Sequence, residues 1–200
     1  MDQIELIKNS INKIGLECSD DQVYKFLKYY EHLIEWNKNI NLTSITDFND
    51  VLLKHFIDSI LICSFIDLKG KNIIDIGTGA GFPGIPLKII EPECNIVLLD
   101  SLNKRIKFLD FIINDLNLSG IKTIHGRAED YARNIDYRYC FDISVSRAVA
   151  NLNTLSEYCI PFLKKGGIFI SYKSDKSDEE INNCKNALKV LCSEISYIKD

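Results

Sequence analysis

The sequence lacks the features that mark membrane, secreted and zinc-binding proteins. No apolar run approaches the roughly 18 residues of a membrane-spanning helix. The acidic, amphipathic start Met-Asp-Gln-Ile-Glu differs from a signal peptide. No two of the seven cysteines have the Cys-x-x-Cys spacing of zinc and redox sites, and most lie inside apolar segments. We therefore expect a cytoplasmic protein with reduced cysteines, no metal site and no contact with membranes.

The sequence also has no excess of positively charged residues. The 24 lysine and arginine residues are outnumbered by 28 aspartate and glutamate residues, so the formal net charge is −4. This balance argues against a protein that coats nucleic acid nonspecifically. Any RNA contact would need a local basic patch, for which the candidates are Lys54, Lys88, Lys104, Arg105, Lys107, Lys164, Lys165 and Lys173. Taken singly, most of these side chains are better explained as a solvated surface.

The pattern of apolar residues predicts one α/β domain with a helical N-terminal extension. Of the 200 residues, 46% are hydrophobic and 26% charged, as in ordinary globular proteins. Helical spacing predicts one helix ending at Gly15, one starting near Asp20 and one over about 47–66. Beyond residue 71, helical stretches separate five expected strands, at 72–76, 95–100, 121–125, 140–146 and 167–173. This order predicts a doubly wound, mostly parallel sheet in 67–200, with 1–66 packed against it.

The strongest motif is a glycine-rich turn between the first strand and a helix. Residues 73–84 read Ile-Ile-Asp-Ile-Gly-Thr-Gly-Ala-Gly-Phe-Pro-Gly. Glycine allows positive φ and lets a ligand approach the backbone closely, and the next helix begins with unpaired N–H groups. By itself, the motif is also compatible with a tight connection that binds nothing. The second strand, however, ends at Asp100, about 20 residues further on, where a carboxylate can accept both hydroxyls of a ribose.

Phe82 distinguishes between two adenosine cofactors. A dinucleotide-binding turn would place its third glycine at this position, beside the pyrophosphate, and Phe82 and Pro83 are too bulky and rigid for that purpose. This disfavours a dehydrogenase. S-adenosylmethionine has no phosphate, and its methionine portion can lie along residues 75–81 with its ammonium near Asp75. We predict that it binds to Asp75, Gly77, Gly79 and Asp100, with Phe82 either closing over it or only packing the next helix.

Six segments between about Trp36 and Lys173 form an ordered series of further motifs. They read Trp-Asn-Lys-Asn-Ile-Asn-Leu-Thr-Ser (36–44), Lys-His-Phe-Ile-Asp-Ser (54–59), Asp-Ile-Gly-Thr-Gly-Ala-Gly-Phe-Pro-Gly-Ile-Pro-Leu (75–87), Leu-Leu-Asp-Ser-Leu-Asn-Lys-Arg-Ile-Lys-Phe-Leu (98–109), Arg-Ala-Glu (127–129) and Ser-Arg-Ala-Val-Ala (146–150). Together they resemble the bacterial 16S rRNA guanine-N7 methyltransferases, the glucose-inhibited division protein B family. The resemblance implies a Rossmann-like methyltransferase fold, S-adenosylmethionine as cofactor, and a monomer that methylates 16S rRNA within the small ribosomal subunit.

The resemblance also implies roles for residues outside the glycine turn. It implies that Ala128 and Glu129 contact the adenine, whereas composition alone would make Glu129 an acid at a helix N-terminus. His55 and Asp58, three apart on one helix face, would be only a surface pair without the family match, which places them at the active site. Lys173 is a further candidate on the substrate side, although this chain has Tyr-Lys-Ser where the family usually has Leu-Lys-Gly.

Arg147 ends the fourth strand, at the edge where ligands bind in open α/β sheets. Ser146 and Arg147 interrupt an apolar run there, which favours a functional role over structural pairing with Asp142 or Glu157. The planar guanidinium suits the cofactor carboxylate, the guanine O6 and an RNA phosphate equally well. We count Arg147 among both the catalytic and the cofactor-binding candidates.

The expected chemistry needs no general base, because guanine N7 already carries a lone pair. Positioning and exclusion of water should therefore supply the catalysis. A-form RNA hides N7 in a deep groove, so the target is expected to be unpaired or flipped out. An Asn-Pro-Pro-Tyr-like motif is missing, which argues against methylation of an exocyclic amine. Two alternatives are a small-molecule methyltransferase, which the acidic balance suits, and an RNA-binding or assembly module without turnover.

The C-terminal end departs from this methyltransferase class. After a helix over about 177–193, residues 194–199 predict the start of a sixth strand. Sheets of the class normally finish with a reversed seventh strand between the fifth and the sixth. We therefore expect a chain truncated at its C-terminus, with an open outer edge on the fifth strand and with Ile168 and Ile170 less covered.

Overall fold

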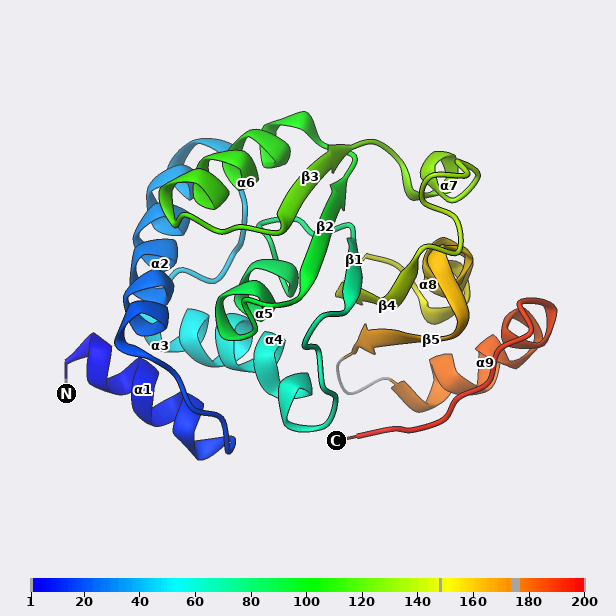
Figure 1. The fold of residues 1–200 in the computed structure, drawn as a ribbon, viewed down its shortest axis with the longest axis horizontal. Helices are drawn as coiled ribbons and strands as arrows, with labels where there is room; N and C mark the ends of the chain where they lie inside the picture. Colours follow the sequence, from blue (N-terminus) through cyan, green and yellow to red (C-terminus); the bar gives the residue numbers. More distant parts are fainter. Residues whose placement is uncertain (1, 148, 174–176, 200) are drawn as a thin grey trace.

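A parallel sheet of five strands forms the centre of the computed structural model, which describes residues 2–147, 149–173 and 177–199 (Figure 1). The spatial order of its strands is β3-β2-β1-β4-β5. Their bounds are Asn72–Ile76 for β1, Asn95–Asp100 for β2, Ile121–His125 for β3, Phe141–Arg147 for β4 and Leu163–Tyr172 for β5. The predicted α/β class is confirmed, although β5 begins earlier than expected. The strand order reverses between β1 and β4, and such a switch point opens a crevice at the carboxyl ends of the strands.

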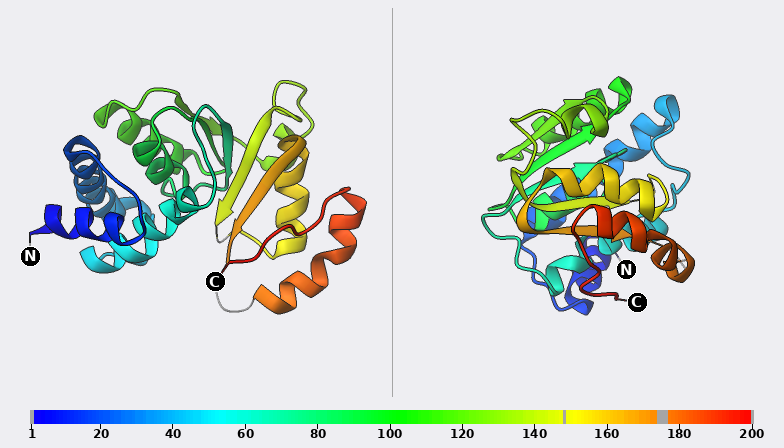
Figure 2. Two further views of the ribbon diagram at one scale, coloured as in Figure 1. Left: turned by 60° about the horizontal axis from the view of Figure 1, so that its bottom comes forward. Right: turned by 90° about the vertical axis from the view of Figure 1, so that its right-hand side faces the viewer.

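Both faces of the sheet are buried, because neighbouring side chains alternate between two apolar cores. Ile73 of β1 points into the larger core and Ile74 into the smaller one. The larger core is completed by α2 (Asp20–Ile40), α5 (Gly84–Ile90) and α6 (Asn103–Asp115), and the smaller one by α7 (Ala128–Tyr131) and α8 (Leu152–Cys159). The two groups of helices lie on opposite sides of the strands in Figure 2.

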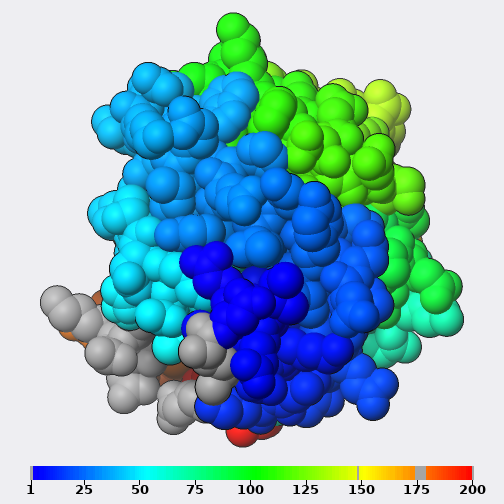
Figure 3. Space-filling view, turned by 90° about the vertical axis from the view of Figure 1, so that its left-hand side faces the viewer, coloured from blue at the N-terminus to red at the C-terminus, as the bar shows by residue number. Residues whose placement is uncertain are grey.

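The N-terminal helices belong to the same larger core as the sheet. They cover much of one side of the molecule, where they lie beside residues of the sheet domain, coloured green in Figure 3. Besides α2 they comprise α1 (Gln3–Lys13) and a helical segment made of α3 (Phe48–Val51), the π-helical turn η1 (Leu52–Ile57), α4 (Asp58–Ile60) and the 3-10 turn η2 (Leu61–Ser64). The expected third helix is therefore present, but it has a wider turn in its middle.

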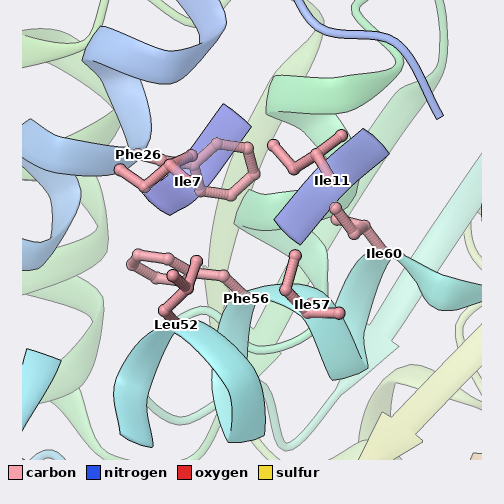
Figure 4. Close-up of a pocket in the computed structure, with 7 residues that line it drawn as sticks. All are labelled: Ile7, Ile11, Phe26, Leu52, Phe56, Ile57 and Ile60. Atoms are coloured by element: carbon pink, nitrogen blue, oxygen red, sulfur yellow. The ribbon is translucent and has the colours of Figure 1, made fainter. Parts of the chain in front are cut away.

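A small packing gap remains where α1, α2 and the helical segment meet (Figure 4). It is too narrow to hold a water molecule, and all of its lining side chains are apolar. Such a gap has no polar group to hold water or a polar ligand. It therefore belongs to the hydrophobic core and not to a binding site.

Gln22 joins α2 to the sheet domain. Its side-chain oxygen accepts a hydrogen bond from Ser19 N at 2.8 Å, while Ser19 Oγ accepts from Gln22 N at 3.2 Å, which completes a capping box. The Gln22 amide nitrogen also donates to the carbonyls of Ile89 and Ile90, at 2.7 and 3.0 Å. The Gln22 side chain thus caps the N-terminus of α2 and supplies a hydrogen-bond donor to two carbonyls at the C-terminal end of α5.

Tyr29 connects α2 to the glycine turn. The residue is fully buried, and its hydroxyl donates to the Ala80 carbonyl at 2.5 Å. Its ring packs against Phe56 and Phe82, with centroids 5.4 Å away in both cases. The longest N-terminal helix therefore fixes the position of the turn that follows β1.

The prediction of a sixth strand is wrong, because residues 194–199 form no strand in the structure. After α9 (Ser177–Val190), this tail runs back past α9 (Figure 1). At its end, the Lys199 ammonium lies 5.2 Å from the centre of the Phe65 ring. It does not pair with β5, so it lacks the backbone partner that a strand requires. β5 is an edge strand as expected, and Ile168 is 44% exposed.

Two further properties concern the described residues as a group. None of their helices is long and apolar enough to cross a membrane. All seven cysteines are free thiols, and no cluster of three or more potential metal ligands occurs within the described ranges.

We expect Tyr29→Phe to lower the free energy of unfolding by about 1–3 kcal/mol, because the buried Ala80 carbonyl loses its donor. Chemical denaturation should measure the change. Tyr24→Phe on the same helix is the matched control, since Tyr24 is 55% exposed, and it should change stability by less than about 0.5 kcal/mol. Equal effects of the two substitutions would contradict this role of Tyr29.

Candidate functional site

The glycine turn has an open side that faces the carboxyl edge of the sheet. Gly77, Gly79 and Gly81 have φ values of 68°, 64° and 99°, so the predicted positive φ is confirmed. The N–H groups of Gly77 and Thr78 donate to the Leu99 carbonyl at 2.8 and 3.2 Å, which ties the turn to β2. A Cβ on Gly79 would have the Gly77 oxygen, 3.9 Å away, as its nearest neighbour. This space allows a ligand to lie along the backbone.

Asp75 is buried beneath the turn. Its Oδ2 accepts from Thr78 Oγ1 at 2.7 Å and from the Gly84 N–H at 2.9 Å. Its Oδ1 is buried without a hydrogen-bond partner among the described residues. Burial raises the pKa of this carboxyl to about 7, although the two hydrogen bonds act in the opposite direction. An unpaired carboxylate oxygen at this place fits an ammonium group.

Gly84 is essential to the turn, and the sequence argument missed it. A Cβ at this position would lie 2.3 Å from Leu98 Cδ2 and 2.9 Å from Asp75 Oδ2. In dinucleotide-binding turns the third glycine permits close packing between helix and strand. Gly84, at the start of α5, provides that close packing here. Gly84 stands at the end of the same glycine-rich run, so its spacing from Gly77 and Gly79 could have indicated this packing role.

Asp100 is held beside the open side of the turn by three donors. Its Oδ2 accepts from Gly79 N at 2.9 Å and from Arg105 Nη1 at 3.2 Å, and its Oδ1 accepts from Leu102 N at 2.8 Å. The carboxylate is only 2% exposed. Arg105, one of the candidate RNA-binding residues, therefore orients Asp100.

Ala128 and Glu129 begin α7, directly beyond the carboxyl end of β3. Asp75 lies next to the end of β1, Asp100 ends β2, and Ala128 comes shortly after β3, so the three lie in a row along one edge of the sheet. The first N–H groups of a helix have no partner within it and are available to a ring nitrogen. The exposed Glu129 carboxylate accepts a hydrogen bond from the Tyr158 hydroxyl, which raises the pKa of that tyrosine.

Arg147, His55 and Asp58 come together where the carboxyl end of β4 meets the helical segment over 48–64. Arg147 Nη1 donates to Asp58 Oδ2 at 2.8 Å and to the Lys54 carbonyl at 3.1 Å, and Nη2 lies 3.4 Å from His55 Nδ1. The Arg147 side chain is only 14% exposed. The structure therefore brings three of the four catalytic candidates into one cluster and does not pair Arg147 with Asp142, which bonds to Lys164 instead.

The π-helical turn helps to place this cluster. The Asp58 N–H donates to the carbonyls of Leu53 and His55, while the Lys54 carbonyl accepts from Arg147. Tyr172, at the end of β5, donates its hydroxyl to the Ser59 carbonyl at 2.7 Å. The helical segment thus lies across the carboxyl ends of both β4 and β5.

His55 is a neutral side chain in this cluster. Burial and the neighbouring Arg147 charge lower the pKa of its imidazole to about 4. Nε2 lies 2.8 Å from the Thr43 hydroxyl, a partner that sequence reasoning missed, although Thr43 belongs to one of the matched segments. A histidine with this pKa is a weak base.

Phe82 is mostly buried between the cofactor turn and the Arg147 cluster. Its ring stacks on His55, with centroids 4.6 Å apart, and the Arg147 guanidinium lies 5.0 Å from the ring centre. At 6% exposure the residue packs the core as well as bordering the site. Both roles considered for Phe82 are therefore compatible with its position.

Lys173 lies outside the cluster, because its ammonium donates to the Ala150 carbonyl at 2.8 Å and pairs with Glu180 at 2.6 Å. The proposed RNA-binding role of Lys88 is wrong, since this side chain is buried and donates to the carbonyls of Pro92 and Cys94.

A model of the family described as rRNA small subunit methyltransferase G matches residues 22–199. The chain is 51% identical over 199 residues to the Ribosomal RNA small subunit methyltransferase G of Clostridium kluyveri, an alignment that covers 99% of this chain and 84% of that protein. This chain belongs to the rRNA small subunit methyltransferase G family. A second member, from Desulfitobacterium hafniense, is 50% identical over 187 residues, or 94% of this chain and 77% of that one. The family resemblance inferred from the six segments is confirmed.

A solved structure supports the same fold at low identity. The M. jannaschii protein TYW2, solved in complex with AdoMet, superimposes with a TM-score of 0.54 at 17% identity, covering 64% of this chain and 58% of that one. As a member of an S-adenosylmethionine-dependent methyltransferase family, this chain uses that cofactor. The unpaired Asp75 oxygen, the open side of Gly79 and the fixed Asp100 carboxylate all fit it.

We expect S-adenosylmethionine to bind about tenfold more weakly at pH 6 than at pH 8. Only the ionised form of Asp75 attracts an ammonium, and with a pKa of about 7 this group is largely protonated at pH 6. Affinity should therefore rise with pH through 7 and level off above it. Calorimetry in matched buffers measures this, with Asp75→Asn as the variant that should lose the dependence. An affinity of the wild-type chain that stays constant across this range would remove Asp75 from the ammonium site.

Proposed function

We propose that this chain transfers a methyl group from S-adenosylmethionine to N7 of a specific guanine in 16S rRNA. It does so in the cytoplasm, as a monomer acting on the small ribosomal subunit. The observation that carries the proposal is the meeting of the cofactor turn and the Arg147 cluster at one crevice, in a chain of this family. Phe82 links the two, since it follows the turn and lies under Arg147.

The residues that would hold the cofactor lie at or near the carboxyl ends of the neighbouring strands β1, β2 and β3. Asp75 would bind the ammonium, the backbone of 77–81 the methionine chain, Asp100 the ribose and Ala128 the adenine. When bound, the cofactor supplies an electrophilic methyl group: an N–C bond forms at N7, the S–C bond breaks, and the positive charge moves from sulfur to the purine. Phe82 closes the side of this path that faces the core.

The cluster suits a nucleophile that needs no deprotonation. His55 is a poor proton acceptor because the pKa of its imidazole is about 4. The Asp58 carboxylate is paired with Arg147, so the two charges offset each other. Guanine N7 has no proton to lose, and such a site can act by positioning the base and excluding water.

The function is tested by incubating the purified 200-residue chain with methyl-labelled S-adenosylmethionine and small-subunit rRNA, either free or assembled. Digestion to nucleosides followed by mass spectrometry should find the label in 7-methylguanosine. Label on an exocyclic amine, or only in added small molecules, would contradict the proposal. Comparison of the two substrates shows whether the assembled subunit is required.

We expect Asp100→Asn to weaken binding of S-adenosylmethionine by about 1–3 kcal/mol, because an amide cannot accept both ribose hydroxyls while it keeps the bonds from Gly79 and Arg105. Calorimetry measures the change. Asp115→Asn is the control, since the only hydrogen-bond partner of the Asp115 carboxylate among the described residues is His32 Nε2, at 2.7 Å, and the side chain is 42% exposed. An unchanged affinity for Asp100→Asn would show that the ribose lies elsewhere.

A further inference from the structure

Asp58 is a half-exposed carboxylate at the mouth of the proposed active site. It is the first residue of α4, and Arg147 Nη1 holds its Oδ2 at 2.8 Å. The same guanidinium lies 5.0 Å from the centre of the Phe82 ring, next to the cofactor turn. Asp58 therefore lies near the proposed cofactor site, with its carboxylate partly exposed.

The carboxylate has hydrogen-bonding capacity left for a ligand. A carboxylate offers about four acceptor positions, and the hydrogen bonds to Asp58 within the described residues come from Arg147 alone. Its side chain is 45% exposed. Lys54, on the same segment, is paired with Asp50 at 2.9 Å. The remaining acceptor sites of Asp58 thus face outward at the mouth.

We propose that Asp58 recognises the Watson–Crick edge of the target guanine, accepting hydrogen bonds from its N1–H and its 2-amino group. This inference rests on the proposed function and adds the residue that selects the base. Guanine carries these two donors on one edge, while O6 and N7 lie on the other, so N7 stays free to face the cofactor. Adenine presents an acceptor at N1, which a carboxylate repels.

The same contact also stabilises the transition state. Methylation at N7 turns the purine into a cation and makes its N1–H more acidic. A hydrogen bond from N1–H to a carboxylate therefore strengthens as the methyl group is transferred, and such contacts raise kcat. Arg147 is a positioning residue in this arrangement, because it fixes the direction of the Asp58 carboxylate.

The test begins with the wild-type chain, which is used to map the methylated position. RNAs are then prepared with guanosine or inosine at that position; inosine keeps N1–H, O6 and N7 but lacks the 2-amino group. The wild-type chain should methylate the guanosine RNA about ten- to hundredfold faster, the usual effect of one hydrogen bond to a charged group. The ratio of dissociation constants for the two RNAs, measured with S-adenosylhomocysteine present, gives a readout without turnover and should also favour guanosine.

Asp58→Asn should reduce the rate on guanosine to the wild-type rate on inosine or below it, because it also weakens the N1–H contact, and should shrink the preference to less than about threefold. Asp50→Asn is the matched control, since Asp50 is another half-exposed carboxylate in an ion pair on the same helical segment. It should retain the wild-type rate and preference. Affinity for S-adenosylmethionine shows whether each variant is folded.

The outcomes separate this inference from the proposed function. A wild-type chain that leaves every guanine unmethylated overturns both. A wild-type chain that methylates guanine but accepts inosine equally well overturns only the role of Asp58, and this result does not depend on whether any variant folds. A folded Asp58→Asn variant that is slow on both RNAs but keeps the full preference would reduce Asp58 to the structural partner of Arg147.

Discussion

The buried carboxylate of Asp75 organises the glycine turn, and the rest of the site depends on this turn. It accepts hydrogen bonds from Thr78, at the near side of the turn, and from Gly84, at the start of α5. The turn can thus reverse direction within a few residues while its backbone stays open toward the carboxyl edge. Burial makes the charged form costly, as the raised pKa shows. A bound ammonium would offset that cost, which couples cofactor binding to the ionisation of one group.

The N-terminal helices complete the site from the other side. Tyr29 fixes the turn through the Ala80 carbonyl, and the helical segment over 48–64 presents His55 and Asp58 to Arg147. The sheet alone supplies a place for the cofactor. The mouth next to it is formed only when the helical segment lies across the ends of β4 and β5. The proposed function thus assigns binding of the methyl donor and selection of its acceptor to different parts of the chain.

Burial changes what several charged residues do. Lys88 and Arg105 look like surface cations in the sequence, yet Lys88 satisfies carbonyls at the end of α5 and Arg105 holds Asp100. The charged guanidinium of Arg147 is mostly buried, and it forms an ion pair with the Asp58 carboxylate. These pairings reduce the number of cations that can contact RNA, in a chain whose net charge is already −4. Recognition of a base by hydrogen bonding fits this surface better than broad attraction to phosphates.

The five strands, the positive φ of the glycine turn and the family could be predicted from the amino-acid sequence, because strand periodicity and glycine chemistry are local properties. The sequence also pointed to Asp75, Asp100 and Arg147, which lie at or next to the ends of their strands at a common edge. The pairing of Arg147 with Asp58, the packing role of Gly84 and the partner of His55 became visible only in the folded chain. The same holds for residues 194–199, which form no strand. Each of these depends on contacts between residues far apart in the chain, and no local pattern encodes which distant residue will be the neighbour.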